Sequence, residues 1–315
     1  MDPESHVDID GLRMIKFFDE GNVRFAMNYE PSADDVFIYS YPKCGTTWTQ
    51  YIVSNIFTAG NPPKTTVDFM LSSPIIELMG EDAVRKMPRP GALMSHLPFD
   101  KRKHSTEAKY IYVTRNPYDC CVSYYHFIKY FTPKHCQEVS FDKFLSLFLS
   151  GDLLYGDYFD HLLSWYPHRE DPNVLFLTYE NLKKDTPYWV LRIAEFLGPP
   201  YGSALSGNQA FLKALLESCS VKSMKTVFTD PTKVWIRKAL DLPLERRIAS
   251  MEVYRKNTAH QEETHLGGGL VRKGSVGDWK SHFSPEHIQQ MKTRIREKTA
   301  GTPDVMNLWE DSGLP

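Results

Sequence analysis

Cysteine is scarce in this sequence, and its few residues do not form obvious pairs. The 315 residues include five cysteines. Their number is odd, no Cys-x-x-C pair occurs, and Cys120 and Cys121 are adjacent. This pattern excludes a disulfide framework and a cysteine-rich zinc site. We therefore expect reduced thiols in an intracellular protein.

The sequence also lacks a long apolar run and an excess of charge of one sign. Its longest apolar stretches, such as residues 144–149, are far shorter than the roughly 18 residues of a membrane-spanning helix. The first residues are acidic and polar, unlike a signal peptide, so we expect a cytoplasmic protein with no membrane partner. The formal net charge of −2 disfavours a dedicated nucleic-acid-binding protein, which usually presents a strongly basic face.

What the sequence does contain is an alternation of short apolar segments with amphipathic ones. With 42% hydrophobic and 24% charged residues, the composition is that of a globular protein. The alternation predicts an α/β fold, with a single domain over residues 1–315 and a central parallel sheet flanked by helices. We predict strands at 36–39, 92–94, 110–113 and 174–178, and helices at 46–59, 118–130, 141–149, 155–165, 187–197 and 284–298.

Residues 226–276 interrupt this alternation. Mixed charges and three consecutive glycines, Gly267 to Gly269, replace the apolar period. The segment is too long for a plain connector. A lid or binding loop over the site and a solvated insertion both fit this composition.

The densest functional signal is the segment 41–48, Tyr-Pro-Lys-Cys-Gly-Thr-Thr-Trp, which joins a predicted strand to a predicted helix. Lys43 supplies a charge, Gly45 allows close backbone approach, and Thr46 and Thr47 offer hydroxyls at a helix start. Such a strand-loop-helix unit can bind a terminal phosphate. The order of residues is not that of a Walker A loop, and no Gly-x-Gly-x-x-Gly follows a strand, so a P-loop NTPase and a dinucleotide-binding fold are disfavoured.

Two further pairs suit a second phosphate. Arg115 ends a predicted strand and Ser123 lies on the following helix, while Arg272 and Lys273 precede Gly274. An Arg fork with a hydroxyl can hold a phosphate, although isolated pairs of this kind are more often surface salt bridges or solvated charges.

His96 is the candidate general base, because it follows a predicted strand in Ser-His-Leu-Pro and a parallel sheet binds ligands at the carboxyl ends of its strands. Its pKa range suits proton abstraction near neutral pH. It is one of eleven histidines, and most histidines in a protein are not catalytic. No His-x-x-x-His spacing with a nearby Glu occurs, so we predict no metal site.

Taken together, these motifs resemble the cytosolic sulfotransferases. The resemblance comprises the segment 41–48, Ser95-His96-Leu97-Pro98, Arg115-Asn116-Pro117-Tyr118-Asp119 with Ser123-Tyr124-Tyr125, Leu177-Thr178-Tyr179-Glu180, and Arg272-Lys273-Gly274-x-x-Gly277-Asp278-Trp279-Lys280. Each motif alone is modest evidence, but five in the same order and spacing, from about Val36 to Trp309, are highly specific.

The resemblance implies an enzyme that uses 3′-phosphoadenosine 5′-phosphosulfate (PAPS), forms adenosine 3′,5′-bisphosphate and needs no metal. His96 would be the general base, and Lys43 would act at the transferring group. The implied nucleotide-binding residues are Lys43, Cys44, Gly45, Thr46, Thr47 and Trp48 at the 5′-phosphosulfate, Arg115, Ser123, Arg272, Lys273 and Gly274 at the 3′-phosphate, Tyr179, Cys219, Ser220 and Val221 at the adenine, and Met224, Leu270 and Val271 beside them. Residues 226–276 would then form the lid.

Some positions depart from the family pattern. Cys44 stands where the loop usually has Ser, and Cys219 replaces a usual Thr. Met94 replaces a Lys two residues before the catalytic His, which removes a cation near the transferring group. The family dimer motif, Lys-x-x-x-Thr-Val-x-x-x-Glu, differs at three positions within 280–289, so we expect a monomer or an atypical dimer.

The sequence thus predicts a sulfotransferase acting on the hydroxyl, or the amine, of a small molecule, for which a phenol or a catecholamine-like compound is our expectation. Two alternatives stay open. One is a nucleotide-binding protein of the same fold with weak or no turnover, suggested by Met94. The other is a small-molecule kinase, which would need a Walker loop and a Mg²⁺-binding carboxylate.

Overall fold

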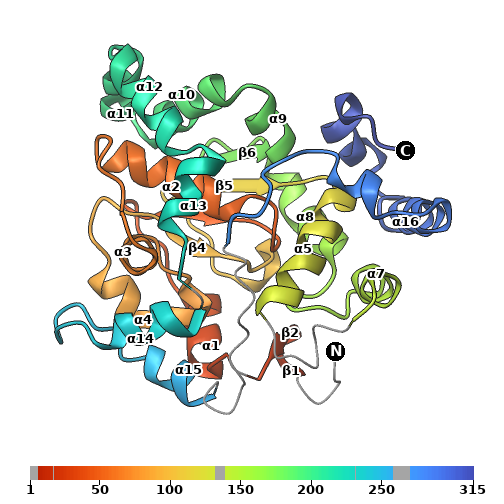
Figure 1. Ribbon diagram of the computed structural model, residues 1–315, viewed down its shortest axis with the longest axis horizontal. Coiled ribbons are helices and arrows are strands. Elements are labelled where there is room, and N and C mark those ends of the chain that lie inside the picture. The colour runs from red at the N-terminus through yellow and green to blue at the C-terminus, as the bar shows by residue number, and fades with distance from the viewer. Residues whose placement is uncertain (1–5, 17, 132–138, 231, 258–269) are drawn as a thin grey trace.

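The computed structural model describes residues 6–16, 18–131, 139–230, 232–257 and 270–315. Its centre is a parallel sheet of four strands in the order β4-β3-β5-β6 (Figure 1). The strands are β3 (Val36–Tyr39), β4 (Leu93–Ser95), β5 (Lys109–Thr114) and β6 (Val174–Thr178). In register, Ile38 of β3 lies between Met94 of β4 and Ile111 of β5.

The strands form where the sequence is continuously apolar. Every residue of β3 and β4 is buried, and so are all residues of β5 after Lys109. Continuous apolar runs are typical of parallel strands, because helices cover both faces of such a sheet. The predicted strands and the α/β fold class are therefore confirmed, with boundaries shifted by one residue at β4 and β5.

Helices surround the sheet in three groups (Figure 1). The first group comprises α2 (Thr46–Phe57), α9 (Tyr179–Lys184), α10 (Thr186–Leu197), α11 (Pro199–Ser206), α12 (Gln209–Ser218) and α13 (Val221–Val227). The second comprises α5 (Pro117–Phe131), α7 (Phe141–Ser150), α8 (Tyr158–Trp165) and α16 (Pro285–Lys298). The third comprises α1 (Glu20–Asn28), α3 (Thr66–Ser72), α4 (Ile76–Lys86), α14 (Thr232–Leu240) and α15 (Met251–Asn257).

Smaller elements complete the described chain. An antiparallel hairpin is formed by β1 (His6–Ile9) and β2 (Leu12–Ile15), and short 3₁₀ helices occupy Phe99–Lys101, Tyr166–His168, Asp278–Ser281 and Pro303–Ser312. No helix in the described ranges has the length and apolar character that crossing a membrane would require.

Two segments differ from the expectation. The helix expected from residue 155 begins at Tyr158, because the Asp157 side chain caps it and Tyr155 and Gly156 have φ angles of +69° and +76°, which end any regular helix. Residues 226–276 are not irregular throughout, since α14 and α15 lie within them. The glycines Gly267 to Gly269 lie outside the described residues.

Two buried carboxylates tie the C-terminal part of the chain to the sheet. Asp119 at the start of α5 accepts hydrogen bonds from the main-chain N–H groups of Gly277 and Trp279 at 2.7 and 3.0 Å. Glu180 after β6 accepts from the indole of Trp309 at 2.8 Å. These contacts bring the segment around Arg272 back over the carboxyl ends of the strands.

Candidate active site

A cavity of about 670 Å³ opens where the strands end. Residues that directly follow each of the four strands line it or border it: Ser40 after β3, His96 after β4, Arg115 after β5 and Tyr179 after β6. This is the edge at which open parallel sheets bind ligands. Of the site residues predicted from the sequence, those lining the cavity are Lys43, Gly45, Thr46, Thr47, Trp48, His96, Arg115, Ser123, Tyr179, Cys219, Ser220, Val221, Met224, Leu270, Val271, Arg272, Lys273 and Gly274.

The loop before α2 is built for close approach by a ligand. Gly45, the N-cap of α2, has a φ of +107°, and a Cβ atom there would lie 2.7 Å from Cδ2 of Tyr179. Only glycine fits this position without displacing the aromatic ring. The N-terminus of the twelve-residue helix α2 adjoins the cavity, and Gly45 has no side chain to cover the loop backbone there. A helix N-terminus in this position is a favourable environment for an anion.

Lys43 lies in this loop with a φ of +72°, a strained conformation for a residue other than glycine. Its Nζ atom lies 4.3 Å from the centroid of the Phe127 ring. Burial and the neighbouring charges of Arg115 and Arg272 lower the pKa of Lys43 to about 8. A bound phosphate would relieve this unfavourable set of cations.

Cys44 is the predicted nucleotide-binding residue that does not line the cavity. Its side chain is fully buried, its Sγ lies 3.7 Å from Sγ of Cys120, and its N–H donates to the carbonyl of Tyr41 at 3.3 Å. Burial raises the pKa of the Cys44 thiol well above its usual range, and the neighbouring Cys120 raises it further. Any contribution to binding would come from its backbone, because the thiol faces the core.

Arg115 is held rigidly at the end of β5. Its Nη2 donates to the carbonyl of Ser275 at 2.8 Å, and its guanidinium carbon lies 4.5 Å from the centroid of the Tyr179 ring. Its Nε is buried without a hydrogen-bond partner. An unpaired buried donor is costly, and an anionic ligand in the adjoining cavity would satisfy it. Ser123 lies two turns further along, on α5.

Arg272 and Lys273 have a partner already in this structure. Both cations bind the carboxylate of Asp278, at 2.5 and 2.6 Å. Burial raises the pKa of Asp278, but hydrogen bonds from Lys273 and Arg272 outweigh this effect and hold it at about 2. A ligand phosphate would therefore compete with Asp278 for these two side chains.

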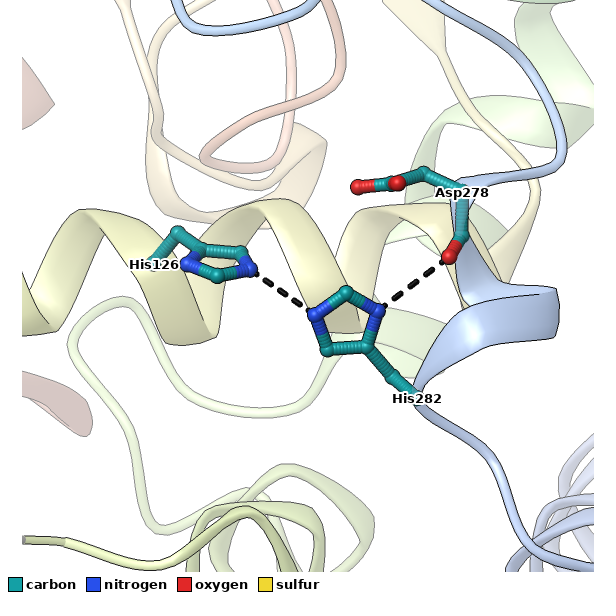
Figure 2. A group of neighbouring side chains, drawn as sticks. All are labelled: His126, Asp278 and His282. Atoms are coloured by element: carbon teal, nitrogen blue, oxygen red, sulfur yellow. Dashed lines mark hydrogen bonds between the residues drawn. The ribbon is translucent and has the colours of Figure 1, made fainter.

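Next to Asp278 the structure gathers two histidines that sequence spacing did not reveal (Figure 2). The Nε2 atoms of His126 and His282 lie 2.9 Å apart, and Nδ1 of His282 lies 3.2 Å from the main-chain oxygen of Asp278. A carbonyl can only accept, so Nδ1 of His282 donates and its Nε2 accepts from His126.

Although the potential ligand atoms of this group lie within 4.8 Å of one another, its chemistry disfavours a metal ion. The two imidazoles use their facing nitrogens for each other, and the carboxylate of Asp278 is bound to Arg272 and Lys273. These two cations would also repel a divalent ion. We interpret the group as a hydrogen-bonded chain that supports Asp278.

The residues expected around an adenine come together from distant parts of the chain. The indole Nε1 of Trp48 donates to the carbonyl of Cys219 at 3.0 Å, and its ring meets that of Tyr179 edge to face at 5.5 Å. A Cβ on Gly274 would lie 2.4 Å from Cγ2 of Val221. The Arg272–Gly274 segment and the start of α13 thus pack tightly against each other. Together these residues form an aromatic and apolar wall of the cavity.

His96 is fixed in one tautomer. Its Nδ1 lies 2.7 Å from the carbonyl oxygen of Ser40, which can only accept, so Nδ1 carries the proton and Nε2 has a free lone pair. Burial lowers the pKa of His96 to about 4, and the nearby charge of Lys43 acts in the same direction. The imidazole is therefore neutral at physiological pH and can accept a proton.

Sequence reasoning missed the residues that surround His96. Its main-chain N–H donates to Oε1 of Glu77 at 2.7 Å, and its main-chain oxygen accepts from Nε2 of His161 at 3.1 Å. The ring of Tyr155 lies edge to face against the His96 ring at 5.1 Å. The one available sequence signal was a single acidic residue, Glu77, in the apolar stretch 74–79.

Many of the residues that line the cavity are apolar. Met94 lines it in place of a cation, as the sequence predicted. The other apolar side chains on this lining include Ile15, Phe18, Met70, Ile75, Leu78, Leu154 and Trp235. Asp230 is the one acidic residue among the described residues of the lining, and Lys238 pairs with it at 2.9 Å.

Comparison with protein families matches residues 33–233 and 244–303 to the family described as "Sulfotransferase domain". Sulfotransferase 2A1 of Rattus norvegicus is 34% identical over 282 residues, which cover 88% of each chain. Sulfotransferase 6B1 of Mus musculus is 32% identical over 282 residues, which cover 87% of this chain and 79% of the mouse protein. Amine sulfotransferase of Oryctolagus cuniculus is 30% identical over 288 residues, covering 90% of this chain and 86% of the rabbit protein.

Solved structures give the same result. The crystal structure of mouse sulfotransferase SULT7A1 complexed with PAP has a TM-score of 0.70 and 26% sequence identity, covering 97% of this chain and 98% of the mouse chain. Retinol dehydratase in complex with androsterone and inactive cofactor PAP has a TM-score of 0.66 at 21% identity, with coverage of 95% and 94%. The second likeness concerns the fold alone.

Proposed function

This chain belongs to the sulfotransferase family, and we propose that it transfers a sulfuryl group from PAPS to the hydroxyl group of a small, uncharged acceptor such as a phenol. The observation that carries this proposal is the convergence of a neutral His96 and three groups of basic side chains on one cavity. A kinase is set aside, because the matched family is that of sulfotransferases and the loop at 41–48 lacks the Walker order.

The residues present fit PAPS. A buried Arg115 Nε lacks a partner, and the absence of a Cβ at Gly45 lets the loop backbone lie close to the Tyr179 ring. We assign Lys43, Gly45, Thr46 and Thr47 to the 5′-phosphosulfate, and Arg115, Ser123, Arg272 and Lys273 to the 3′-phosphate. Trp48, Tyr179 and residues 219–221 would contact the adenine. When bound, PAPS supplies an activated sulfuryl group with a good leaving group.

In the proposed reaction, His96 Nε2 removes the proton of the acceptor hydroxyl as its oxygen attacks sulfur in line with the leaving phosphate. Lys43 and the N-terminus of α2 stabilise the charge that grows on that phosphate. The Nδ1–H of His96 keeps its bond to Ser40 throughout, which stabilises the imidazolium formed at the end of the step.

The lining of the cavity favours an apolar acceptor over a cationic amine. Many of the side chains that line the cavity are hydrocarbon, thioether or aromatic, and the acidic Asp230 is engaged by Lys238. A protonated amine would therefore lose hydration without gaining a free carboxylate. Phenols remain our expectation, and catecholamines become the weaker alternative. The cytoplasmic location of the protein remains a prediction. The same holds for the lid formed by residues 226–276, to which Trp235 and Leu270 would belong.

Transfer of labelled sulfuryl from PAPS to a panel of phenols, catecholamines, steroids and long-chain alcohols would test this function. We expect turnover with at least one phenol and weaker turnover with amines. His96→Ala should lower turnover by about 10²–10⁴-fold, the usual contribution of a general base, while calorimetry shows unchanged affinity for adenosine 3′,5′-bisphosphate. Nucleotide binding without transfer to any acceptor would favour the inactive alternative, and near-normal turnover of His96→Ala would refute the role of His96.

A further inference from the structure

A buried carboxylate lies directly behind His96. Glu77, in the first turn of α4, has no exposed surface. Its Oε1 accepts both the His96 main-chain N–H at 2.7 Å and the Tyr155 hydroxyl at 2.9 Å, while its Oε2 is buried without a hydrogen-bond partner. Burial raises the pKa of Glu77, partly offset by the His96 N–H. Within the described ranges no Lys or Arg forms a salt bridge with it, so this is an expensive group to bury.

Tyr155 is the second unusual residue at this point. Its φ of +69° is rare for a bulky side chain and signals strain. Its neighbours fix it, since its N–H donates to the carbonyl of Arg13 at 2.9 Å and the carbonyl of Gly156 accepts from the Tyr41 hydroxyl at 3.0 Å. Burial and the nearby Glu77 raise the pKa of Tyr155 well above its usual range, so the phenol stays protonated and donates.

Both unfavourable features converge on His96. Glu77 fixes its main chain, and Tyr155 contacts its ring at 5.1 Å while donating to the same carboxylate oxygen. Neither arrangement is needed to cover the sheet, because an apolar side chain at position 77 would pack there without burying a charge. Strain and buried polar groups that persist together at one site indicate a functional constraint.

We propose, on the basis of the function proposed above, that Glu77 and Tyr155 are positioning residues that hold His96 with Nε2 directed into the cavity. They act through His96 and not on the acceptor. Glu77 sets the main chain at the end of β4, and Tyr155 sets the tilt of the imidazole. With Nδ1 bound to Ser40, the ring is then constrained at one nitrogen and by the ring of Tyr155.

The test compares Glu77→Ala, Glu77→Gln and Tyr155→Phe in the native chain and in a His96→Ala background. In the native chain we expect kcat to fall about 10- to 100-fold for Glu77→Ala, since misplacing a catalytic group by about 1 Å has that effect. Tyr155→Phe should lower kcat less. KM for PAPS and affinity for adenosine 3′,5′-bisphosphate should change by less than about twofold, because the nucleotide contacts of the cavity lie elsewhere.

Glu77→Gln should keep more activity than Glu77→Ala, because its amide oxygen still accepts both hydrogen bonds. The double variant Glu77→Ala with Tyr155→Phe should lose no more than Glu77→Ala alone, because both changes break the same contact. In the His96→Ala background none of the changes should lower the residual turnover further.

Tyr29→Phe is the matched control. The Tyr29 hydroxyl also donates at 2.9 Å to a fully buried carboxylate, that of Asp35, but neither residue lines the cavity. Its kcat should equal that of the native protein. If breaking any buried hydrogen bond between a tyrosine and a carboxylate lowered kcat, kcat would fall in Tyr29→Phe as well.

Two results would overturn the proposal. One is that Glu77→Gln and Tyr155→Phe both have the same kcat as the native protein, and that Glu77→Ala, if it folds, does so as well. The other is an equal loss with and without His96, which would show that the pair serves only folding. Should Glu77→Ala fail to fold, Glu77→Gln and Tyr155→Phe carry the comparison. Full activity of His96→Ala itself would refute the proposed role of His96, an outcome distinct from failure of the positioning pair.

Discussion

Burial lowers the pKa of both catalytic candidates, and the two shifts have different consequences. His96, with a pKa lowered to about 4, stays neutral over the physiological range, although it is a weaker base than an exposed histidine. Lys43, with a pKa lowered to about 8, is still mostly charged at neutral pH but loses its proton more easily than an exposed lysine. The same desolvation thus keeps the Nε2 lone pair of His96 available and makes the charge of Lys43 easier to lose.

A bell-shaped pH dependence of kcat/KM for PAPS follows from these two residues. The rate should fall as pH drops through about 4, because His96 becomes protonated, and as pH rises through about 8, because Lys43 loses its charge. When kcat is measured at saturating PAPS, the alkaline limb of its pH profile should move to higher pH, because the bound phosphates stabilise the charged form of Lys43. Lys43→Arg stays charged, so an alkaline limb that persists unchanged in this variant would assign it to another group.

Met94 lines the cavity two residues before His96, at the position where the resemblance to the cytosolic sulfotransferases implies a lysine. Met94→Lys should raise kcat for at least one acceptor by about tenfold or more, because one hydrogen bond to a charged group contributes roughly 1.5–3 kcal/mol and about 1.4 kcal/mol is a factor of ten. Met94→Gln is the matched control, similar in length but uncharged. Steady-state kinetics across the acceptor panel decide the question. Unchanged kinetics of the lysine variant for every acceptor would mean that the missing cation has no functional role.

At the scale of elements, the site depends on where parallel strands end. The loop before α2, residues 123–128 of α5 and the segment 270–275 are far apart in sequence, yet all contribute to the lining of one cavity. The carboxyl ends of β3, β4, β5 and β6 lie at one edge of the sheet, and the right-handed crossovers of a parallel sheet return each strand to it. Asp119 and Glu180 then hold the C-terminal segment over this edge.

These separate elements predict selectivity for the 3′-phosphate. Loss of two or three charge-assisted hydrogen bonds, each roughly 1.5–3 kcal/mol, should weaken binding by at least ~10²-fold. Adenosine 5′-phosphosulfate should therefore be a poor donor, and adenosine 3′,5′-bisphosphate a tight product inhibitor. Arg115→Ala should reduce the difference in affinity between PAPS and adenosine 5′-phosphosulfate, because it weakens the binding of PAPS selectively. Lys43→Ala should mainly reduce turnover.

Calorimetry with the two donors measures this difference directly. Arg192→Ala is a suitable control, because Arg192 lies in an exposed pair with Glu195 outside the cavity and exposed pairs contribute little. Equal affinity of the native protein for both donors would show that the basic residues near Ser123 and Gly274 do not form a 3′-phosphate subsite.

At the scale of the whole molecule, part of the segment 280–289 makes contacts within the chain, while Lys280, Pro285 and Gln289 are exposed. Pro285 is the first residue of α16, where its missing N–H is not needed, and Ser284 and His287 form a capping box around it. His282 bonds to His126, and His287 pairs with Asp142 at 2.9 Å. These contacts engage His282 and His287 within the chain, and Pro285 lacks the main-chain N–H that a paired segment would use.

We therefore expect a monomer, or a dimer that uses another surface, at moderate concentration. Light scattering of the purified chain, with and without adenosine 3′,5′-bisphosphate, measures this. A tight dimer that substitutions within 280–289 abolish would contradict the expectation and show that the altered motif still pairs.

The sequence by itself determined the fold class, the strands and part of the cavity lining, since all predicted site residues except Cys44 line the cavity. Continuous apolar runs such as 36–39 specify buried parallel strands, and motifs such as 41–48 carry their chemistry within a few adjacent residues. The helices in 226–276 escaped prediction, because their apolar residues gain order mainly from tertiary packing, as Trp235 does against the cavity.

Only the tertiary structure decided which polar groups meet. Asp278 holds Arg272 and Lys273, the Cys44 thiol turns into the core, and Glu77 lies behind His96 with Tyr155. Glu77 lies 19 positions from His96 and 78 from Tyr155, and even the contacts of Asp278 with Arg272 and Lys273 depend on distances below about 3 Å between charged or hydrogen-bonding atoms. Local sequence patterns specify helices and strands through periodicity, but they carry no information about such distances, which are set when the elements pack.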